Sequence, residues 1–546
     1  MQWVWRWLRQ FCTTGLLLGT LFFAFSLTPS LIPRPSVIQG VISGVSFTAG
    51  YTLGVMARWL WNYLELPVPS VRLDRLARIG AAVVCMLFAI GFLWQASEWQ
   101  NTVRALMETE PAGGVQPLTV AAIAMLVFVV LVLLARLFLW TFQILSRRLE
   151  RYVPRRVSHV VGVFAALALF WSVVDGVIFT LGLRAADNSY QQLDVLMQDD
   201  VARPDDPVST GGPESLITWE ELGGRGRRFV TSGPTGDEIG DFLGERAPDP
   251  IRVYVGLNAA DTPEEHADLA LQELLRVDAF ERSVLLLATP TGRGWVDNAA
   301  QNPVEYILRG DVATVTAQYS YLPSPLSLMV EGEYGQETAR ALFNRVYGYW
   351  SDLPEDDRPD LYLHGLSLGA LNSDRSFDVY DIIDDPFHGA LWSGPPFRSE
   401  TWRTVTAGRD AGSPAWLPRF RDGSVVRFMN QDGGLDDFDT DWGQFRIAIL
   451  QYASDPVTFF DPMSFYSEPD WMREPRGPDV SDDLRWFPVV TMLQLLADMA
   501  AGRAPTGYGH EYAEAHYIEA WVALTEPDNW SDEDSERLKA LFDERE

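Results

Sequence analysis

The sequence contains very little cysteine and only one lysine. Its 546 residues include two cysteines, Cys12 and Cys85, and the single lysine is Lys539. Both cysteines lie in apolar runs near the N-terminus, so the rest of the chain has neither a disulfide framework nor a cysteine-rich metal site. A Gly-rich phosphate loop and internal repeats are also missing. No metal or organic cofactor is indicated.

Positive charge is scarce in the last two thirds of the chain. Residues 1–184 carry 15 arginines and 7 acidic residues, a net charge of +8. Residues 185–546 carry 28 basic and 66 acidic residues, a net charge of −38. Because phosphate binding relies on lysine and arginine, this acidic surface disfavours nucleic acid as a partner.

The first third contains five long apolar runs, at about residues 11–32, 37–60, 79–95, 117–140 and 159–182. Most reach the roughly 20 residues that cross a hydrocarbon core, and the third needs its flanks to do so. The first run could be a signal peptide, but it lacks a small-residue cleavage site, and we interpret it as retained. The runs therefore predict a helical transmembrane domain of five spans over residues 1–184.

Arginines alternate between the two sides of these runs. They cluster before the first run, after the second and after the fourth, as Arg6, Arg9, Arg58, Arg72, Arg75, Arg78, Arg147, Arg148, Arg151, Arg155 and Arg156. The other connections hold only Arg34, Arg104 and Arg184. This asymmetry predicts a cytoplasmic N-terminus and, after an odd number of spans, an extracytoplasmic acidic part. Asp175, inside the fifth run, is either a hydrated boundary residue or part of a polar path.

The acidic part divides at about residue 250. Residues 185–249 are rich in Asp, Gly, Pro and Ser, which predicts a tether or an irregular lead-in. Beyond them we expect strands at 251–255, 284–288, 313–319, 360–363, 389–393, 424–429 and 445–452. Helices are expected from residue 261 and at 333–350, 368–380, 487–501 and 511–524. The alternation predicts a mostly parallel sheet flanked by helices over residues 250–546.

One short motif in this part points to chemistry. Gly365-Leu366-Ser367-Leu368-Gly369 follows an apolar run and precedes a plausible helix. A Gly-x-Ser-x-Gly between a strand and a helix is typical of a nucleophile elbow, whose glycines allow a turn tight enough to expose the serine hydroxyl. We therefore expect Ser367 to be the nucleophile of an acyl-transfer reaction, and the fold to be that of an α/β-hydrolase.

A serine nucleophile needs a base, and the histidines after it limit the choice. In this fold class the chain order is serine, acid, histidine. Only His388, His510 and His516 follow Ser367. His510 lies in a glycine-bearing loop before a helical segment, and we expect it to be the base. His388 comes too early in the chain, and His516 falls inside an amphipathic stretch.

The base in turn needs a carboxylate that orients it. Asp455 ends an apolar strand and lies 55 residues before His510, so we expect it to be the acid. Asp432, just after the 424–429 strand, is the alternative, and Asp461 is a weaker one.

An oxyanion hole needs backbone amides, for which two segments are candidates. The amide of Leu368 would supply the first donor. The loop 289–295, with Thr291 and Gly292, would supply the second unless it is an ordinary turn. The region 395–445 could form a cap over an apolar pocket or simply pack in the core, through Trp402, Trp416, Phe420, Phe438 and Trp442.

Several segments together resemble a bacterial, actinobacterial-type family of membrane-anchored α/β-hydrolases. The resemblance lies in residues 26–34, Gln39-Gly40, Gly50-Tyr51, 290–296, 365–369 and 451–456. It implies a multi-span N-terminal domain joined to a C-terminal catalytic domain, with Ser367 as the nucleophile. Asp455 and His510 fit as its partners by position and flanking residues.

These observations favour a membrane-anchored serine hydrolase that acts on acyl esters, with lipid or cell-envelope molecules as substrates and membrane lipids as partners. An acyltransferase would use the same acyl-enzyme with a different acceptor. The alternatives are a serine peptidase and a non-enzymatic membrane module that retains the fold for binding.

Overall fold

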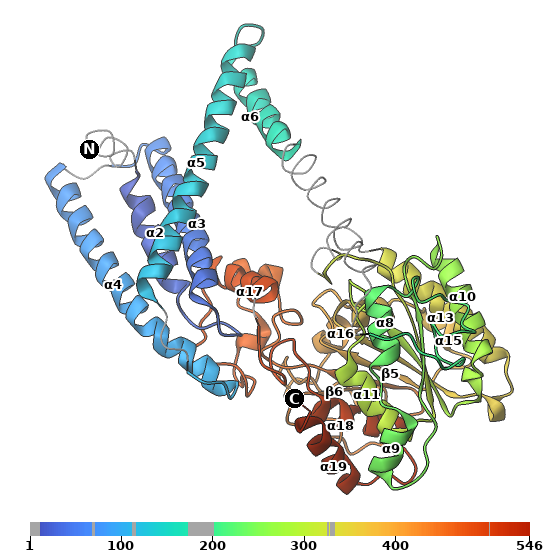
Figure 1. The fold of residues 1–546 in the computed structure, drawn as a ribbon. Helices are drawn as coiled ribbons and strands as arrows, with labels where there is room; N and C mark the ends of the chain where they lie inside the picture. Colours follow the sequence, from blue (N-terminus) through green and yellow to red (C-terminus); the bar gives the residue numbers. More distant parts are fainter. Residues whose placement is uncertain are drawn as a thin grey trace. The chain divides into compact units, whose positions relative to one another are not determined.

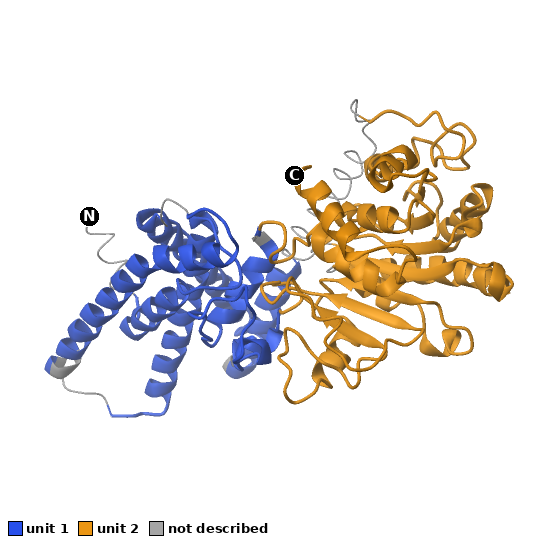
Figure 2. Ribbon diagram, turned by 90° about the horizontal axis from the view of Figure 1, so that it is seen from below, with its two compact units in different colours: residues 1–185, 460–504 blue, residues 186–459, 505–546 orange. Residues whose placement is uncertain are grey.

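Figure 1 shows the fold as a computed structural model, which describes residues 11–67, 71–111, 116–172, 201–324, 327, 333–501 and 503–545. The chain forms two compact units, coloured separately in Figure 2. Unit 1 comprises residues 1–185 and 460–504, and unit 2 comprises residues 186–459 and 505–546. Each unit therefore combines segments that are far apart in the sequence.

Unit 1 is mainly helical. Its N-terminal part contains α2 (Thr13–Phe25), α3 (Ser36–Tyr63), α4 (Val71–Leu106), α5 (Pro117–Leu149) and α6 (Arg155–Trp171). Helix α2 packs against α3 and α4, while α5 packs against α3 and α6. Glycines bring the helices close together: a Cβ on Gly50 would lie 2.6 Å from the Leu18 carbonyl oxygen, and one on Gly44 would lie 2.7 Å from that of Ala124. Small residues at helix contacts are typical of membrane bundles.

The structure supports three of the five predicted spans. Within the described ranges, three helices are long and apolar enough to cross a membrane: Ser36–Tyr63, Arg75–Leu106 and Pro117–Leu149. The prediction for the first run needs correction. Helix α2 has 13 residues, a length of about 20 Å, which is short of the roughly 30 Å of a hydrocarbon core. It ends at Phe25, and Pro29, Pro33 and Pro35 prevent the chain from continuing as a helix.

The fifth predicted run is described only in part. Helix α6 has 17 residues and is too short to count as a span by itself. Residues 173–200 lie outside the described residues, so the expectation for Asp175 stays a prediction.

The rest of unit 1 comes from late in the chain. Residues 460–504 contain the 3-10 turns η4 (Pro462–Phe465) and η5 (Asp470–Met472) and the helix α17 (Val490–Ala501). We call residues 460–504 the excursion, because the chain leaves unit 2 after Phe459 and returns to it at Pro505. Helix α17 packs against α3. Phe487 stacks on Phe25 of α2, with ring centroids 4.2 Å apart.

A buried ion pair fastens the excursion to the connection between α2 and α3. Arg34 Nε donates to Asp498 Oδ1 over 2.6 Å, and both side chains are fully buried. The Leu31 amide donates to Asp498 Oδ2 over 3.3 Å, and Gln494 Nε2 donates to the Thr28 carbonyl over 3.0 Å. Burial raises the pKa of Asp498, and the charge of Arg34 counteracts this. The excursion is thus joined to the helices by a buried ion pair and by hydrogen bonds to backbone groups.

Unit 2 is built on a parallel sheet. Its described strands are β1 (Ile251–Val255), β2 (Val284–Thr289), β3 (Val312–Ala317), β4 (Asp360–Leu366), β5 (Gly389–Ser393), β6 (Val426–Met429) and β7 (Arg446–Leu450). They pair in the order β1-β3-β2-β4-β5-β7-β6, and every pair is parallel. The prediction of a parallel sheet flanked by helices is confirmed.

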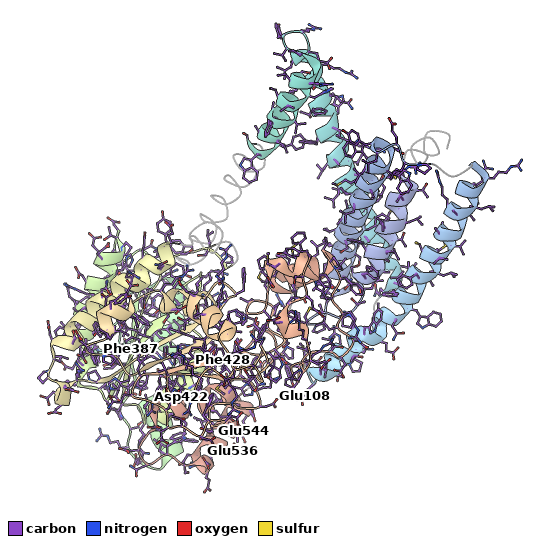
Figure 3. The ribbon with its side chains drawn as sticks, turned by 180° about the vertical axis from the view of Figure 1, so that it is seen from behind. Glu108, Phe387, Asp422, Phe428, Glu536 and Glu544 are labelled. Carbon is purple, nitrogen blue, oxygen red and sulfur yellow. The ribbon has the colours of Figure 1, made fainter. Side chains whose placement is uncertain are left out.

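Helices cover both faces of this sheet. One face packs against α10 (Pro263–Arg276), α13 (Tyr334–Asp352) and α14 (Leu368–Asp374), with α15 (Val379–Ile382) and α16 (Glu400–Ala407). The other packs against α9 (Gly236–Leu243), α11 (Asn298–Ile307), α18 (Glu514–Thr525) and α19 (Asp532–Asp543). Phe387 and Phe428, labelled in Figure 3, are fully buried in the first core. Burial on both faces explains why the strands are continuous apolar runs.

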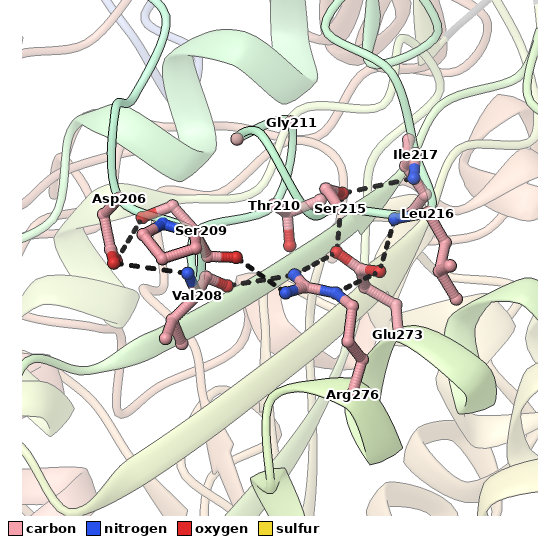
Figure 4. Close-up of polar contacts among 12 residues, drawn as sticks. Asp206, Val208, Ser209, Thr210, Gly211, Ser215, Leu216, Ile217, Glu273 and Arg276 are labelled. Atoms are coloured by element: carbon pink, nitrogen blue, oxygen red, sulfur yellow. Dashed lines mark hydrogen bonds and ion pairs between the residues drawn. The ribbon is translucent and has the colours of Figure 1, made fainter.

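Residues 201–249 are a folded part of unit 2, where the composition predicts a tether or an irregular lead-in. They contain α8 (Gly223–Thr231) and α9. Figure 4 shows how the segment is attached: Ser215 Oγ and the Leu216 amide donate to the carboxylate of Glu273 on α10, over 2.6 and 3.0 Å. Arg276 binds the same carboxylate over 2.7 Å.

Candidate active site

Ser367 stands at a sharp turn between β4 and α14. The strand ends at Leu366 and the helix begins at Leu368, so Ser367 alone makes the connection. Its backbone has φ 57° and ψ −122°, a conformation that costs a residue with a side chain about 1–3 kcal/mol. The Ser367 amide donates to the Ser393 carbonyl of β5 over 2.9 Å, which holds the turn in place.

The two motif glycines make this turn possible. A Cβ on Gly365 would lie 2.3 Å from the carbonyl carbon of Gly369. A Cβ on Gly369 would lie 2.2 Å from the carbonyl oxygen of Thr289, at the end of β2. Any larger residue would push α14 away from the strands, so the spacing in the motif has a steric cause.

Asp455 and His510 meet although they are 55 residues apart. His510 Nδ1 lies 2.7 Å from Asp455 Oδ2. Asp455 follows the end of β7, and His510 lies in the loop before α18. The Gly509 amide donates to Ser454 Oγ over 2.9 Å, which fastens the histidine loop to the segment that carries the aspartate.

The carboxylate of Asp455 is fully buried and fixed by several donors. Its Oδ1 accepts from the Val457 amide over 2.8 Å. Its Oδ2 accepts from Thr458 Oγ1 over 3.0 Å and from the Tyr512 hydroxyl over 2.8 Å, as well as meeting His510. These contacts leave the carboxylate one orientation, and that orientation fixes which nitrogen of His510 carries a proton.

The two other aspartates considered as the acid lie elsewhere. The Asp432 amide donates to Asn430 Oδ1 in a turn after β6. Asp461 begins η4 in unit 1, where its carboxylate accepts from the Met463 amide over 2.7 Å. Neither has an ion pair with a histidine among the described residues, whereas Asp455 does.

His510 has its second nitrogen free. Its Nε2 is buried and has no hydrogen-bond partner within the described part of the chain. Burial alone would lower the pKa of His510, but the charge of Asp455 and its hydrogen bond outweigh the burial, so the pKa is raised. A neutral imidazole held in this way can accept a proton at Nε2, because Asp455 stabilises the imidazolium that forms.

The histidine ring and the serine are both close to one backbone segment, Ser393-Gly394. A Cβ on Gly394 would lie 2.8 Å from His510 Cε1, and the preceding Ser393 accepts the Ser367 amide. Among the described residues no hydrogen bond joins Ser367 Oγ to His510 Nε2. Such bonds are often long or misaligned without a substrate and shorten when one binds.

The other histidines of unit 2 have different surroundings. His388 lies at the amino ends of β4 and β5, the opposite edge from Ser367, with Nε2 3.0 Å from Asp360 Oδ1. His516 Nδ1 is 2.5 Å from the Tyr452 hydroxyl. Burial lowers the pKa of His364, in β4, to about 4, so this ring is neutral and structural.

The two segments predicted to supply backbone amides to the oxyanion hole differ in their hydrogen bonding. Leu368 is the first residue of α14, and the first amides of a helix have no partner inside the helix. The amide of Thr291 donates to the Trp295 carbonyl over 2.9 Å and closes a turn, and the role of Thr291 stays a prediction. Gly292 keeps a candidate amide, whose contact with Ser324 Oγ is 3.3 Å long.

The aromatic residues of the region 395–445 pack on unit 2. Trp402 Nε1 donates to Gln451 Oε1 over 2.6 Å, and Gln451 Nε2 donates to the Trp416 carbonyl over 2.8 Å. Trp402 and Phe420 are half-buried against the core of the first face. The reading of these residues as core packing is thus supported.

Two further residues near the histidine were not found from the sequence. Tyr512 bonds Asp455 from two positions after His510, and burial raises its pKa well above the ordinary value. Asp297 is buried at the start of α11, where it accepts from the Tyr517 hydroxyl over 3.0 Å. Burial raises the pKa of Asp297 to about 7. The only feature of the sequence that pointed to Asp297 was its residue type, because aspartate is common at the start of helices.

No group of three histidine, cysteine or acidic side chains in the described ranges is placed to hold a metal ion. The arrangement instead offers a strained serine, an oriented imidazole and a buried carboxylate.

Two family models match this chain. The model of an alpha/beta-hydrolase family matches residues 251–538, from β1 into α19. The chain belongs to this alpha/beta-hydrolase family. A second model, for the N-terminus of an alpha/beta-hydrolase family, matches residues 27–234. No curated protein and no solved structure matches the chain.

The two matched ranges of this alpha/beta-hydrolase divide the chain near β1. The C-terminal range contains Ser367, Asp455, His510 and the excursion, and the N-terminal range contains α3 to α6 and α8. The expected resemblance is therefore confirmed for the hydrolase family and its N-terminal family domain. A bacterial origin and the membrane anchor stay predictions.

Proposed function

We propose that this chain is a membrane-anchored serine hydrolase of acyl esters that uses Ser367, His510 and Asp455. The pairing of His510 Nδ1 with the buried Asp455, which leaves Nε2 unpartnered, is the observation that carries the proposal. A binding module would have no need for a serine held at φ 57° beside such a pair. The three helices long enough to span a bilayer support the anchor.

The reaction proceeds through an acyl-enzyme. Ser367 Oγ attacks the ester carbonyl carbon while His510 Nε2 takes the hydroxyl proton. Asp455 stabilises the imidazolium, and the amide of Leu368 donates to the oxyanion, with Gly292 as the candidate second donor. The ester bond then breaks, and the leaving alkoxide takes the proton from His510. Water, activated by the same histidine, releases the acid and restores Ser367.

The arginine asymmetry of the sequence supports an extracytoplasmic hydrolase unit. The arginine-rich connections after α3 and after α5 are expected on the cytoplasmic side, so the fifth predicted run, of which the structure describes α6, must also cross the bilayer to place the hydrolase unit outside the cytoplasm. In that location the substrates would be esters of lipids or of the cell envelope.

Labelling of the detergent-solubilised protein by a fluorophosphonate tests the activated serine. We expect labelling of the natural protein, none of Ser367→Ala, and strongly reduced labelling of His510→Ala. His516→Ala is the matched control and should be labelled normally. A well-folded natural protein that is not labelled, or a Ser367→Ala variant that is, would contradict the proposal.

A further inference from the structure

The excursion has an exposed apolar tip, formed by Met463, Phe465 and Tyr466 in and just after η4. Their side chains are 49%, 45% and 53% exposed. The rings of Phe465 and Tyr466 contact each other, with centroids 4.9 Å apart. A group of large apolar side chains that faces water is typical of a surface that contacts another protein or a membrane.

The backbone holds the apolar tip outward. The Val489 amide donates to the Phe465 carbonyl over 2.8 Å. Trp486 Nε1 donates to the Ser464 carbonyl over 2.7 Å, and Ser464 is itself buried. The turn is thus fastened to the start of α17, so its apolar side chains cannot fold back without breaking these bonds.

The body that carries the apolar tip also carries the candidate membrane spans. Unit 1 contains the three long apolar helices, and the excursion is joined to them through Phe487 on Phe25 and through Asp498 on Arg34. The bilayer around these helices is therefore the partner that we expect to cover the apolar tip.

The charge of the excursion indicates which kind of lipid surface it fits. Residues 460–504 carry eight acidic and four basic residues, a net charge of −4. Anionic headgroups would repel this segment, so contact with a bilayer must come from insertion of apolar side chains. Met, Phe and Tyr suit this role, because Tyr keeps its hydroxyl at the headgroups while its ring is buried.

We propose that the apolar tip inserts into the surface of the bilayer and that the ester substrates are lipids held in that bilayer. This rests on the proposed function. Chain length supports it for any placement of the units: eight residues lead from Asp455 to Met463, and they span at most about 29 Å. One leaflet with its headgroups is about 20–22 Å thick. The length of the chain between Asp455 and the inserted tip is thus little greater than the thickness of one leaflet.

A fluorescent probe at the apolar tip tests the insertion. In a chain with Cys12→Ser and Cys85→Ser, Phe465→Cys is labelled with an environment-sensitive dye and reconstituted into phosphatidylcholine vesicles. Asp422→Cys, at an exposed position of unit 2 labelled in Figure 3, is the matched control. We expect the probe at 465 to emit at shorter wavelength and to be quenched by lipids spin-labelled near the headgroup, and the control to show neither effect.

Either of two other results would overturn the proposal that the apolar tip inserts into the bilayer. A probe at 465 that behaves like the control lies in water. A probe that emits at shorter wavelength without quenching by lipid is covered by protein, either a second copy or another chain. This readout needs no catalysis, so it is independent of the proposed hydrolase activity.

A comparison of two esters tests the substrate class. The variant Met463→Ser/Phe465→Ser/Tyr466→Ser should lose on the order of tenfold in hydrolysis of a long-chain ester held in the vesicles. Its hydrolysis of a short water-soluble ester should change less than twofold. Equal losses on both esters would mean that the tip only supports the fold. If the natural protein hydrolyses neither ester, the proposed function fails while the probe result still stands.

Discussion

The two units each bury an aspartate, but they pair it differently. In unit 2, Asp455 meets His510, whose protonation can change in the range of physiological pH. In unit 1, Asp498 meets Arg34, whose guanidinium is a hydrogen-bond donor only. The two carboxylates are 43 residues apart, and the boundary between the units lies between them.

The difference shows how one buried carboxylate can serve chemistry and another only assembly. The pair with histidine leaves Nε2 without a partner, so it can take up a proton. The pair with arginine has no nitrogen that can take up a further proton, and its contacts join segments 464 residues apart in the chain. Variants that exchange or remove these partners should separate the two roles.

The largest effect is expected for Asp455→Asn. An asparagine keeps the volume but not the charge that stabilises the imidazolium, so kcat on a soluble ester should fall about 10⁴-fold. Asp432→Asn is the matched control and should keep its rate, and steady-state kinetics measures both. A larger loss of kcat in Asp432→Asn than in Asp455→Asn would identify Asp432 as the acid instead.

The corresponding change in unit 1 should affect stability. Asp498→Asn leaves the buried Arg34 without a counter-charge, which costs about 3–5 kcal/mol. Thermal unfolding in detergent and protease cleavage within residues 460–504 would detect this. The double variant Arg34→Met/Asp498→Leu should recover most of the loss. An Asp498→Asn variant as stable as the natural protein would refute the structural role.

A pH-dependent effect is expected from Asp297. Its pKa is raised to about 7 in the folded protein, from 3.8. Between these values the unfolded chain loses a proton that the folded chain keeps, so stability falls as pH rises from about 4 to 7 and stays lower above. Asp297→Asn removes this loss, and it should be more stable than the natural protein at pH 8 by on the order of 1–3 kcal/mol.

Thermal unfolding at pH 4.5 and pH 8 measures this difference. The gain should be present at pH 8 and nearly absent at pH 4.5. The same gain at both values would mean that the carboxyl of Asp297 does not titrate in this range.

The smallest effect is expected for Tyr512→Phe. It removes one hydroxyl donor from Asp455 Oδ2, a loss of about 1 kcal/mol. The value of kcat/KM should fall about fivefold, because the carboxylate and the imidazole are less firmly held. Tyr380→Phe, at an exposed position, is the control. Equal rates for Tyr512→Phe and the natural protein would make the hydroxyl dispensable.

The sheet and its candidate residues could be predicted because local signals carried them. The strands from β1 to β7 are short apolar runs bounded by turn residues, and Ser367 lies between glycines whose spacing has a steric cause. Asp455 and His510 followed from chain order, since few histidines come after Ser367. The hydrogen bond that closes the turn at Thr291 leaves no trace in the sequence pattern, so it could not be predicted.

The helical unit was harder to predict because its contacts are long-range. Hydropathy extended the first run to residue 32, but α2 ends at Phe25 before a proline-rich connection. Arg34 was counted only as a charge in the connection after the first run, yet its side chain is fully buried against Asp498. No local pattern reveals a partner 464 residues away, and the same holds for the assignment of residues 460–504 to unit 1.

The pairing of Arg34 with Asp498 also sets the order of events during synthesis. A ribosome adds about 5–20 residues per second, so the 464 residues between them take roughly 25–90 seconds. Throughout that time the helices of unit 1 must wait with an arginine that has no counter-charge. Unit 1 is therefore incomplete until residue 498 has left the ribosome, and any chain interrupted before that residue carries an unfinished helical unit.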